Sequence, residues 1–437
     1  MTGVPDDKLI RLGPWPAGVN TLAKEDAVPA GELRQAVNVD IDRDGIPSRR
    51  LGQTLRYAGT RVHSIWNERP FPFGLFVQAG TLMAFWPDTS TSVLQTGLAP
   101  LLPVANALVY DRVYWSNGQQ LGVVTSSGAV TGWGVETPDG QANLASAAAG
   151  GLNGGQYQVT FTFVSATGEE SGAYGAATVT VPDGGGIAVT AVPQPLGSGV
   201  TAVRAYRTPA NGDAFYYARD LPVGLTSVTL TESALGKPLD TQFLDRMPAV
   251  TRLALLNGRL YGAAGPDLVW SEPLRYGLTH PLKNRIGFGH PIDLLVTVGD
   301  GTDGAGLYIA AGARTYFLGG GEPDKFTRQT VRGYGVTPGS GLRAPGSVFG
   351  LEHPVQAPVA YWIDAQGIAC LGLPGGSVQG IRERQAAAPL ATSAVSLLRE
   401  QNGVRQIITS LRGPAGQGLS VVDTAVASVT RNGVPMP

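Results

Sequence analysis

Glycine and proline interrupt this chain so often that long helices have little room to form. Together the 61 glycines and 32 prolines make up about a fifth of the 437 residues. Between them lie short runs rich in Val, Ile, Tyr, Phe and Thr, which favour strands. Because 43% of the residues are hydrophobic, the chain can bury a core, and disorder does not explain the glycine content. We therefore expect an all-β protein.

Two segments are expected to depart from this pattern. PAGELRQAVN (29–38) has the composition of a short helix of about two turns. ATSAVSLLRE (391–400) is a second helix candidate, with Thr392 or Ser393 as its N-terminal cap.

Faint internal repetition predicts the architecture. LFVQAGTLMAF (75–85) and LYIAAGARTYF (307–317) share an apolar triplet, an Ala-Gly pair and a final Phe, and VYWSNG (113–118) is similar to LVWSEP (268–273). Asn402-Gly403 is a strong two-residue hairpin signal. Similar units at uneven intervals are typical of β-propeller blades with insertions, and a set of unrelated hairpins is the alternative.

The middle of the chain has a different pattern, with clean alternation and strands recurring every 8 to 12 residues or so. In the run that begins at Gly154, one face of a strand would carry Tyr157, Val159, Phe161 and Phe163. Blade-like sequence lies on both sides, so we expect a β-sandwich inserted into a propeller. The predicted divisions are an N-terminal hairpin with the first blades at 1–150, the inserted sandwich at 151–247 and the remaining blades at 248–437.

Charge and cysteine content exclude several classes of function. The formal net charge is −1 and only 15% of the residues are charged, which argues against a basic groove for nucleic acid. The single cysteine, Cys370, excludes an intrachain disulfide framework and any multi-cysteine metal site. No segment has the apolar core of a signal peptide or a membrane span, so we expect assembly in a reducing cytoplasm.

One motif suggests a metal. In AVNVDIDRDGIPSRRLG (36–52), Asp40, Asp42, Asp44 and Gly45 match the first half of a calcium loop. The twelfth position of such a loop is a bidentate Glu, and here it is Leu51. A plain hairpin with an acidic turn needs no metal, so the hairpin is the favoured interpretation and no metal or cofactor is expected.

No catalytic constellation is evident, and we expect no enzyme. There is no Gly-x-Ser-x-Gly elbow, and Cys370 lies in an apparent strand as a small buried hydrophobe. The carboxylates that a glycosidase would need fall in turn-like sequence and are expected to be solvated: Glu169, Glu170, Asp300 and Asp303.

The segment 18–52 resembles the N-terminal region of phage tail proteins, in particular the nozzle or tail-hub proteins of short-tailed bacteriophages. These share a hairpin of the form L-R-x-A-x-N-V-D-I-D-x-x-G followed by a basic R-R-x-G strand. The matching positions are Leu33, Arg34, Ala36, Asn38, Val39, Asp40, Ile41, Asp42, Gly45, Arg49, Arg50 and Gly52. The middle of the chain is similar to the fibronectin type III-like modules of phage tails.

The resemblance implies a structural virion protein rather than an enzyme. It implies a homo-oligomeric ring, a hexamer, that contacts portal and adaptor ring proteins and tail fibre or needle proteins. The ring would retain viral DNA and then conduct it during ejection, without stable membrane insertion. The hairpin residues would then serve as structural or subunit-contact residues: Asn38, Asp40, Asp42, Gly45, Arg49 and Arg50.

Two rivals predict other features. A receptor-binding tail protein that recognises host surface glycan needs exposed aromatic residues on one loop face. The tryptophans fall mostly inside apparent strands: Trp66, Trp86, Trp115, Trp133, Trp270 and Trp362. A polysaccharide-degrading propeller needs converging carboxylates, at least one with a raised pKa.

Overall fold

The chain is almost entirely β in the computed structural model. The structure describes residues 13–41, 44–50, 54–173, 175–197, 199–349, 355–401, 404–413, 426–431 and 434–436. These residues contain no α-helix, only three short 3₁₀ turns: η1 (Glu25–Ala27), η2 (Pro323–Lys325) and η3 (Gly346–Val348). None of the described helical turns has the length or apolar character of a membrane crossing.

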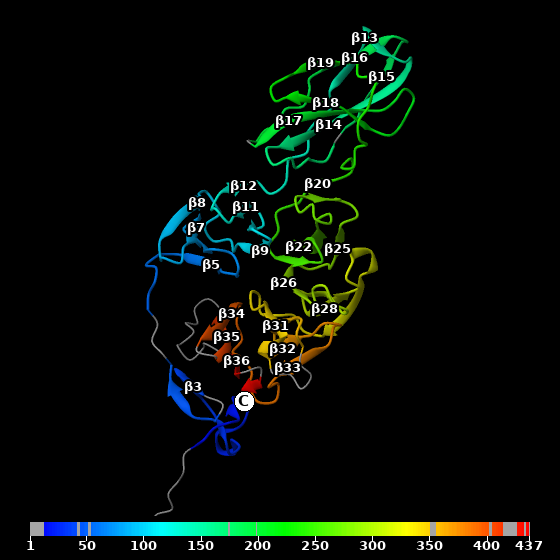
Figure 1. Ribbon diagram of the computed structural model, residues 1–437. Helices are drawn as coiled ribbons and strands as arrows, with labels where there is room; N and C mark the ends of the chain where they lie inside the picture. Colours follow the sequence, from blue (N-terminus) through cyan, green and yellow to red (C-terminus); the bar gives the residue numbers. More distant parts are fainter. Residues whose placement is uncertain are drawn as a thin grey trace, which may run out of the picture. The chain divides into compact units, whose positions relative to one another are not determined.

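Two compact units divide the chain (Figure 1). The middle unit is Tyr57–Gly289, and the terminal unit combines Met1–Arg56 with His290–Pro437. Outside residues 143–230, the described part of each unit contains three four-stranded antiparallel sheets whose neighbouring strands are consecutive or nearly so in sequence. Repeated four-stranded sheets of this kind are typical of propeller blades, so the fold is all-β and propeller-like.

The middle unit's three sheets pack in sequence order. The first holds β5 (Val62–Trp66), β6 (Gly74–Gln78), β7 (Thr81–Phe85) and β8 (Thr91–Gln95). The second holds β9 (Ala105–Val109), β10 (Arg112–Ser116), β11 (Leu121–Thr125) and β12 (Val130–Thr131). The third holds β21 (Leu253–Leu256), β22 (Arg259–Ala264), β23 (Asp267–Trp270) and β25 (Arg285–Gly287). One apolar core joins the first sheet to the second, and another joins the second to the third.

The terminal unit repeats this arrangement. Its first sheet holds β26 (Ile292–Val298), β27 (Gly306–Ala311), β28 (Arg314–Gly319) and β29 (Thr327–Arg332). The next holds β30 (Leu342–Pro345), β31 (Pro358–Ile363), β32 (Ala369–Gly372) and β33 (Val378–Ile381). The last holds β34 (Ser393–Gln401), β35 (Val404–Arg412), β36 (Val426–Arg431) and β37 (Val434–Met436). Again one core lies between each neighbouring pair of sheets.

The first pair of repeated sequence units forms hairpins in equivalent places. Residues 75–85 form most of β6 and β7, and residues 307–317 form most of β27 and β28, each pair being the second and third strands of its sheet. The second pair does not, because residues 113–116 lie in β10, the second strand of its sheet, and residues 268–270 lie in β23, the third. The predicted repetition is therefore confirmed for the first pair only.

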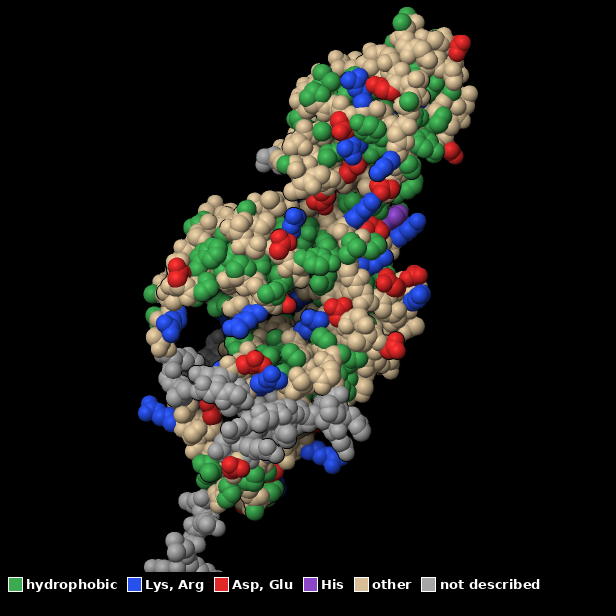
Figure 2. All heavy atoms as spheres, in the orientation of Figure 1, with side chains coloured by type: hydrophobic (Ala, Val, Ile, Leu, Met, Phe, Trp, Pro, Cys, Tyr) green, Lys and Arg blue, Asp and Glu red, His purple; other side chains and the backbone are tan. Residues whose placement is uncertain are grey.

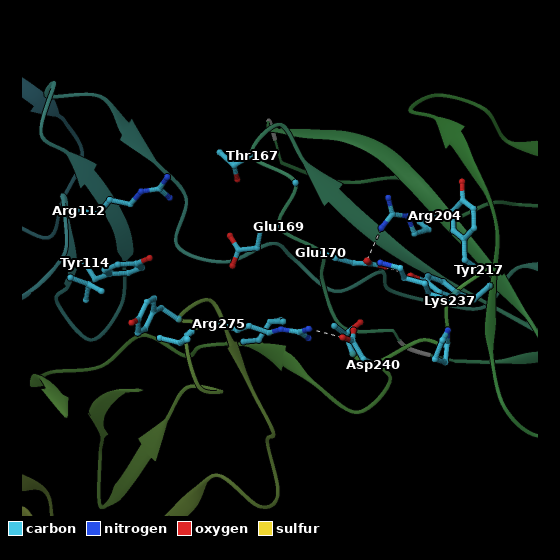
Figure 3. Close-up of a pocket in the computed structure, with 18 of the residues that line it drawn as sticks. Arg112, Tyr114, Thr167, Glu169, Glu170, Arg204, Tyr217, Lys237, Asp240 and Arg275 are labelled. Atoms are coloured by element: carbon cyan, nitrogen blue, oxygen red, sulfur yellow. Dashed lines mark hydrogen bonds and ion pairs between the residues drawn. The ribbon is translucent and has the colours of Figure 1, made fainter. Parts of the chain in front are cut away.

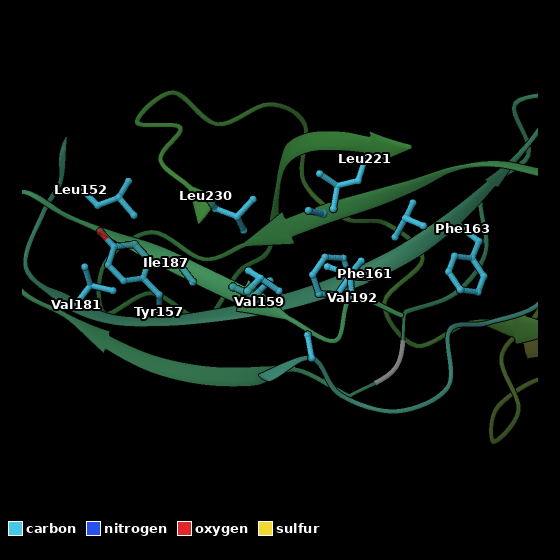
Figure 4. Close-up of a cluster of buried hydrophobic side chains, with 14 of the residues drawn as sticks. Leu152, Tyr157, Val159, Phe161, Phe163, Val181, Ile187, Val192, Leu221 and Leu230 are labelled. Carbon is cyan, nitrogen blue, oxygen red and sulfur yellow. The ribbon is translucent and has the colours of Figure 1, made fainter. Parts of the chain in front are cut away.

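An inserted module (residues 143–230) consists of two sheets around one core (Figure 4). One sheet has the order β13 (Asn143–Leu152), β16 (Gly185–Thr190), β19 (Ser227–Leu230). The other has the order β15 (Ala177–Val181), β14 (Gly155–Ser165), β17 (Val200–Arg207), β18 (Tyr216–Pro222). The alternating face predicted for β14 is confirmed, because its four side chains are all buried in this core: Tyr157, Val159, Phe161 and Phe163.

The two connections to the inserted module lie side by side. The Thr137 hydroxyl donates to the Asp245 carboxylate at 2.7 Å. Trp133, before the module, and Met247, after it, are buried in the same core between the second and third sheets. A short two-stranded sheet of β20 (Asp245–Arg246) and β24 (Leu278–Thr279) follows. The module therefore interrupts the middle unit without separating its sheets.

Both predicted helices are wrong. Residues 29–38 contain only β2 (Glu32–Leu33), which pairs in parallel with β1 (Gly18–Val19). Residues 391–400 form most of β34, which pairs with β35 along its length. The burial of β34 alternates around Ala394, which is buried, and Val395, which is exposed, as a strand requires. Cross-strand pairing outweighs the weak helix propensity of this sequence.

Candidate functional site

The Asp-rich segment folds as the predicted hairpin, formed by β3 (Val39–Ile41) and β4 (Pro47–Arg49). Asn38 has a φ of 57°, and its carbonyl accepts the Arg50 N–H at 3.0 Å, which closes the open end of the hairpin. The Arg50 Nε atom lies 3.1 Å from Asp40 Oδ1. Arg49 is exposed on β4.

Asp40 also faces the last sheet of the terminal unit. The Nη2 atom of Arg399 on β34 lies 3.8 Å from Asp40 Oδ2, and Gln406 Nε2 on β35 donates to Oδ1 at 3.4 Å. The carboxylate is therefore surrounded by cationic and amide donors. Of its proposed calcium-loop companions, Asp44 is exposed and Asp42 lies outside the described residues. Across the described residues, no group of three or more His, Cys, Asp or Glu side chains is placed to hold a metal ion.

Gly45 occupies the tightest position of the hairpin turn. Its φ is 79°, and a Cβ atom there would lie 2.4 Å from the Pro16 nitrogen. The Gly45 carbonyl accepts the Trp15 N–H at 2.8 Å. Only glycine combines this left-handed conformation with such a close approach of another backbone segment.

The segment before the hairpin is fastened to the loop between β33 and β34. Asn20 Nδ2 and Gln385 Nε2 donate to the two carboxylate oxygens of Glu32, at 2.6 and 2.9 Å. The Thr21 N–H donates to the Gln385 carbonyl at 2.8 Å, and Arg34 donates to the Asn20 and Thr21 carbonyls. We call residues 13–41 and 44–50 the N-terminal strap, because they bind chain segments about 350 residues away.

A buried polar cluster lies under β31 and β32. The Asp364 side chain is fully buried, and its Oδ2 atom lies 2.9 Å from Arg332 Nη2. Its Oδ1 atom accepts the N–H groups of Gln366 and Ile368, both at 2.9 Å. Burial first, and then the Asp364 charge, raise the pKa of the nearby Cys370 thiol to about 12. The prediction that Cys370 is a small buried hydrophobe is confirmed.

A cavity of about 1000 Å³ lies within the middle unit, between the inserted module and the sheets that carry it (Figure 3). One wall comes from the β9–β10 hairpin and the turn at 274–278. The other comes from the turn at 167–170, from β17 and β18, and from the connection at 236–241. Five tyrosines line it: Tyr110, Tyr114, Tyr206, Tyr217 and Tyr276.

The tyrosines form two groups. The rings of Tyr114 and Tyr276 have centroids 5.6 Å apart, and Tyr110 makes a side-chain hydrogen bond with Tyr276. On the module side, the rings of Tyr206 and Tyr217 have centroids 6.2 Å apart in an edge-to-face arrangement. Burial first, and then the Glu169 charge, raise the pKa of Tyr114 to about 12. Burial also raises the pKa of Tyr206 and of Tyr276, so the hydroxyls of these three tyrosines remain neutral hydrogen-bonding groups at physiological pH.

Two acidic residues in this cavity correct the sequence interpretation. Glu170 is not a solvated turn residue, because Thr162, Tyr206 and Arg204 donate to its carboxylate at 2.6, 2.6 and 2.7 Å. Glu169 is half-buried and points into the cavity (Figure 3), and burial raises the pKa of its carboxyl group, partly offset by Arg112. Asp300 and Asp303 do lie in exposed turns, as expected.

Most of the cavity lining gave no signal in the sequence. Its residues come from six stretches between Val109 and Leu278, and no two stretches share a motif. The sequence around Glu169 and Glu170 predicts only a turn. The sequence does predict the place of several tryptophans, which fall inside apparent strands. Trp115, Trp133 and Trp362 are fully buried and cannot form a binding surface.

Comparisons with known proteins assign no family. No protein-family model matches the chain, and no curated protein matches it. Among solved structures, the N-terminal domain of Nup159 has a TM-score of 0.29 and 11% identity, over 84% of this chain and 78% of that chain. Porphyromonas gingivalis dipeptidyl peptidase 4 has a TM-score of 0.29 and 11% identity, over 86% of this chain and 49% of that chain.

The α-L-arabinofuranosidase Arb93A from Fusarium graminearum has a TM-score of 0.27 and 10% identity, over 76% of this chain and 92% of that chain. TM-scores this low attach neither the families nor the activities of these proteins to the chain.

Proposed function

We propose that this chain is a structural subunit of a phage virion, a nozzle or tail-hub protein that assembles into a ring, a hexamer, below the portal and adaptor. In this role it retains the genome and conducts it at ejection. The observation that carries the proposal is the N-terminal strap, which bears the phage-tail resemblance. Of its matching residues, Asp40 contacts Arg399 of β34, and Arg34 and Arg50 make contacts within the strap.

The proposed architecture is a β-propeller with an inserted fibronectin type III-like sandwich. The four-stranded sheets outside the inserted module, three in each unit among the described residues, support the blades. The seven strands of the inserted module, in sheets of three and four around one core, support the sandwich.

Exposed apolar side chains on the strap support a role in assembly. Leu22, Val37 and Ile46 are 52%, 46% and 56% exposed, and Leu55, just after the strap, is 78% exposed. The strap already contacts the rest of the terminal unit through other residues. Its exposed large apolar side chains therefore suit a contact between subunits.

The surface charge also suits a DNA conduit. On the face drawn in Figure 2, basic and acidic side chains are interspersed, and neutral atoms cover most of the area. A channel that conducts DNA must not grip it, because each phosphate neutralised by Lys or Arg adds affinity that depends on salt.

The proposal is tested by measuring whether the protein assembles into a ring. We would measure the mass of the purified protein by mass photometry, alone and with portal and adaptor proteins, and obtain electron-microscopic class averages. A ring with a central channel is expected, and Ile46→Asp or Leu55→Asp should prevent it without unfolding the subunit. The matched control is Leu196→Asp, which alters a 93% exposed residue of the inserted module. A stable monomer or trimer that never joins a portal complex would contradict the proposal.

One observation favours a second candidate, a tail protein that recognises host surface glycan. Trp115, Trp133 and Trp362 are fully buried, but Tyr110 is 79% exposed at the rim of the tyrosine-lined cavity. Aromatic side chains in a polar cavity are the groups that such recognition needs.

A further inference from the structure

The charges that line the cavity cancel. Its basic residues are Arg112, Arg204, Lys237 and Arg275, and its acidic residues are Asp111, Glu169, Glu170 and Asp240. Three of these pairs are ion pairs, because Arg204 binds Glu170, Arg275 Nη2 lies 2.5 Å from Asp240 Oδ2, and Arg112 Nε lies 3.9 Å from Asp111 Oδ1. A phosphate or a polycation needs a lining of the opposite net charge, so neither suits this cavity.

One carboxylate of the lining, that of Glu169, has room for a hydrogen-bond donor from a ligand. Among the described residues, none donates a hydrogen bond to the Glu169 carboxylate, although the group is half-buried. Its Oε1 atom lies close against Gly277, where an added Cβ atom would be only 2.0 Å away. A half-buried carboxylate without a donor favours a ligand that brings O–H or N–H groups to it.

The aromatic groups lie on either side of this acceptor. Figure 3 shows Tyr114 and Arg112 on one side of Glu169, and Tyr217 with Arg204 on the other. The guanidinium of Arg204 lies 5.4 Å from the Tyr217 ring centroid, which holds that ring in place. Two separated aromatic groups with an acceptor between them suit an extended ligand, and the cavity volume lies at the upper end of the usual range for ligand sites.

We infer that this cavity binds a neutral oligosaccharide. Sugar rings present apolar C–H faces that pack on tyrosine rings, and hydroxyls that both donate and accept hydrogen bonds. The lining supplies both kinds of partner, with Glu169 as the acceptor and Arg112 and Lys237 as donors. The inference does not depend on ring assembly, and it gives the second candidate function a defined site.

The experiment uses the full-length protein and four hexasaccharide probes. Three are neutral, namely maltohexaose, cellohexaose and laminarihexaose, and one is anionic, a hyaluronan hexasaccharide. Inorganic phosphate and trilysine serve as chemical comparisons. Binding is measured by isothermal titration calorimetry. We expect at least one neutral hexasaccharide to bind, and phosphate and trilysine not to compete with it.

Substitutions of cavity residues test whether the ligand binds there. Glu169→Gln and Tyr217→Ala should each weaken binding at least tenfold. Tyr110→Ala should also weaken it, and because Tyr110 is 79% exposed, its truncation leaves the core intact. The matched control is Tyr334→Ala, a 45% exposed tyrosine of the terminal unit, which should bind as the unaltered protein does.

The inference is overturned if no neutral hexasaccharide of the set binds, if phosphate or trilysine competes with one that does, or if the cavity variants bind as tightly as Tyr334→Ala. Ring assembly is measured separately, so each proposal can fail without the other.

Discussion

At the scale of single residues, the burial of a charged group decides how much its ion pair contributes to the stability of the terminal unit. Asp364 is a fully buried carboxylate whose oxygens accept from Arg332 and from two backbone N–H groups. Asp300 forms the comparable pair with Arg343, 3.7 Å apart, with both side chains 40% exposed. Exposed pairs contribute little to stability, whereas removing one partner of a buried pair leaves an uncompensated charge.

We therefore expect Asp364→Asn to lower the opening free energy of the β31–β32 region by about 3 kcal/mol. Asn keeps an acceptor for the backbone N–H groups but removes the buried charge 2.9 Å from Arg332, which leaves that guanidinium facing the half-exposed Glu383 carboxylate 3.5 Å away. The matched control, Asp300→Asn, should cost under about 1 kcal/mol. Native-state hydrogen exchange of the β31 and β32 amides measures both. Equal effects of the two substitutions would contradict the argument.

Cys370 gives a prediction for pH. With its pKa raised to about 12, the folded thiol stays protonated, and at pH 8 only about one molecule in 10⁴ carries the reactive thiolate. The stabilising effect of this neutral thiol is complete below the unfolded pKa, about 8.5, and is lost as the pH rises towards 12. Iodoacetamide at pH 8 should leave native Cys370 unmodified and should modify it fully in denaturant, as read by intact mass. Ser127→Cys, in an exposed turn, provides a reactive comparison thiol, and equal native rates for the two cysteines would contradict the prediction.

At the scale of elements, the sequence predicted hairpins well and isolated strands less well. The turns Ala79-Gly80 and Gly312-Ala313 are recognisable because the turn chemistry is local. The strand β34 was mistaken for a helix because its sequence has fair propensity for both states. Its pairing with β35 decides the outcome, and that pairing cannot be read from β34 alone.

Gly45 tests whether the hairpin turn fastens the strap. Gly45→Ala should loosen it, because the new Cβ atom meets the Pro16 nitrogen at 2.4 Å in addition to the cost of a left-handed alanine. Gly97→Ala is the matched control, since Gly97 has the same φ of 79° with nothing within 4 Å of the added atom. We expect limited proteolysis to cleave the strap faster in Gly45→Ala only. Equal protection of the strap in both variants would contradict the argument that the close approach at Gly45 requires glycine.

At the scale of the whole molecule, the site was harder to predict than the fold. The all-β class follows from composition and local turn signals, which act over a few residues. The cavity depends on where the inserted module lies against the β9–β10 hairpin, and its lining joins residues as distant as Val109 and Leu278. Nothing in a local pattern specifies that Glu169 will face Tyr114 rather than solvent.

The position of the inserted module leads to a last prediction. Because Thr137 and Asp245 are joined by a 2.7 Å hydrogen bond, replacing residues 138–244 with a short Gly-Ser linker should leave the three sheets of the middle unit in place. The variant should keep its cooperative thermal transition and, as a nozzle subunit, its ring. It should lose oligosaccharide binding, since Glu169, Arg204 and Tyr217 are removed. Deleting residues 105–131 instead takes away the sheet that contributes to two cores, so that protein should not fold. If the module deletion abolished folding as completely, the module would be part of the middle unit's core and not an insertion.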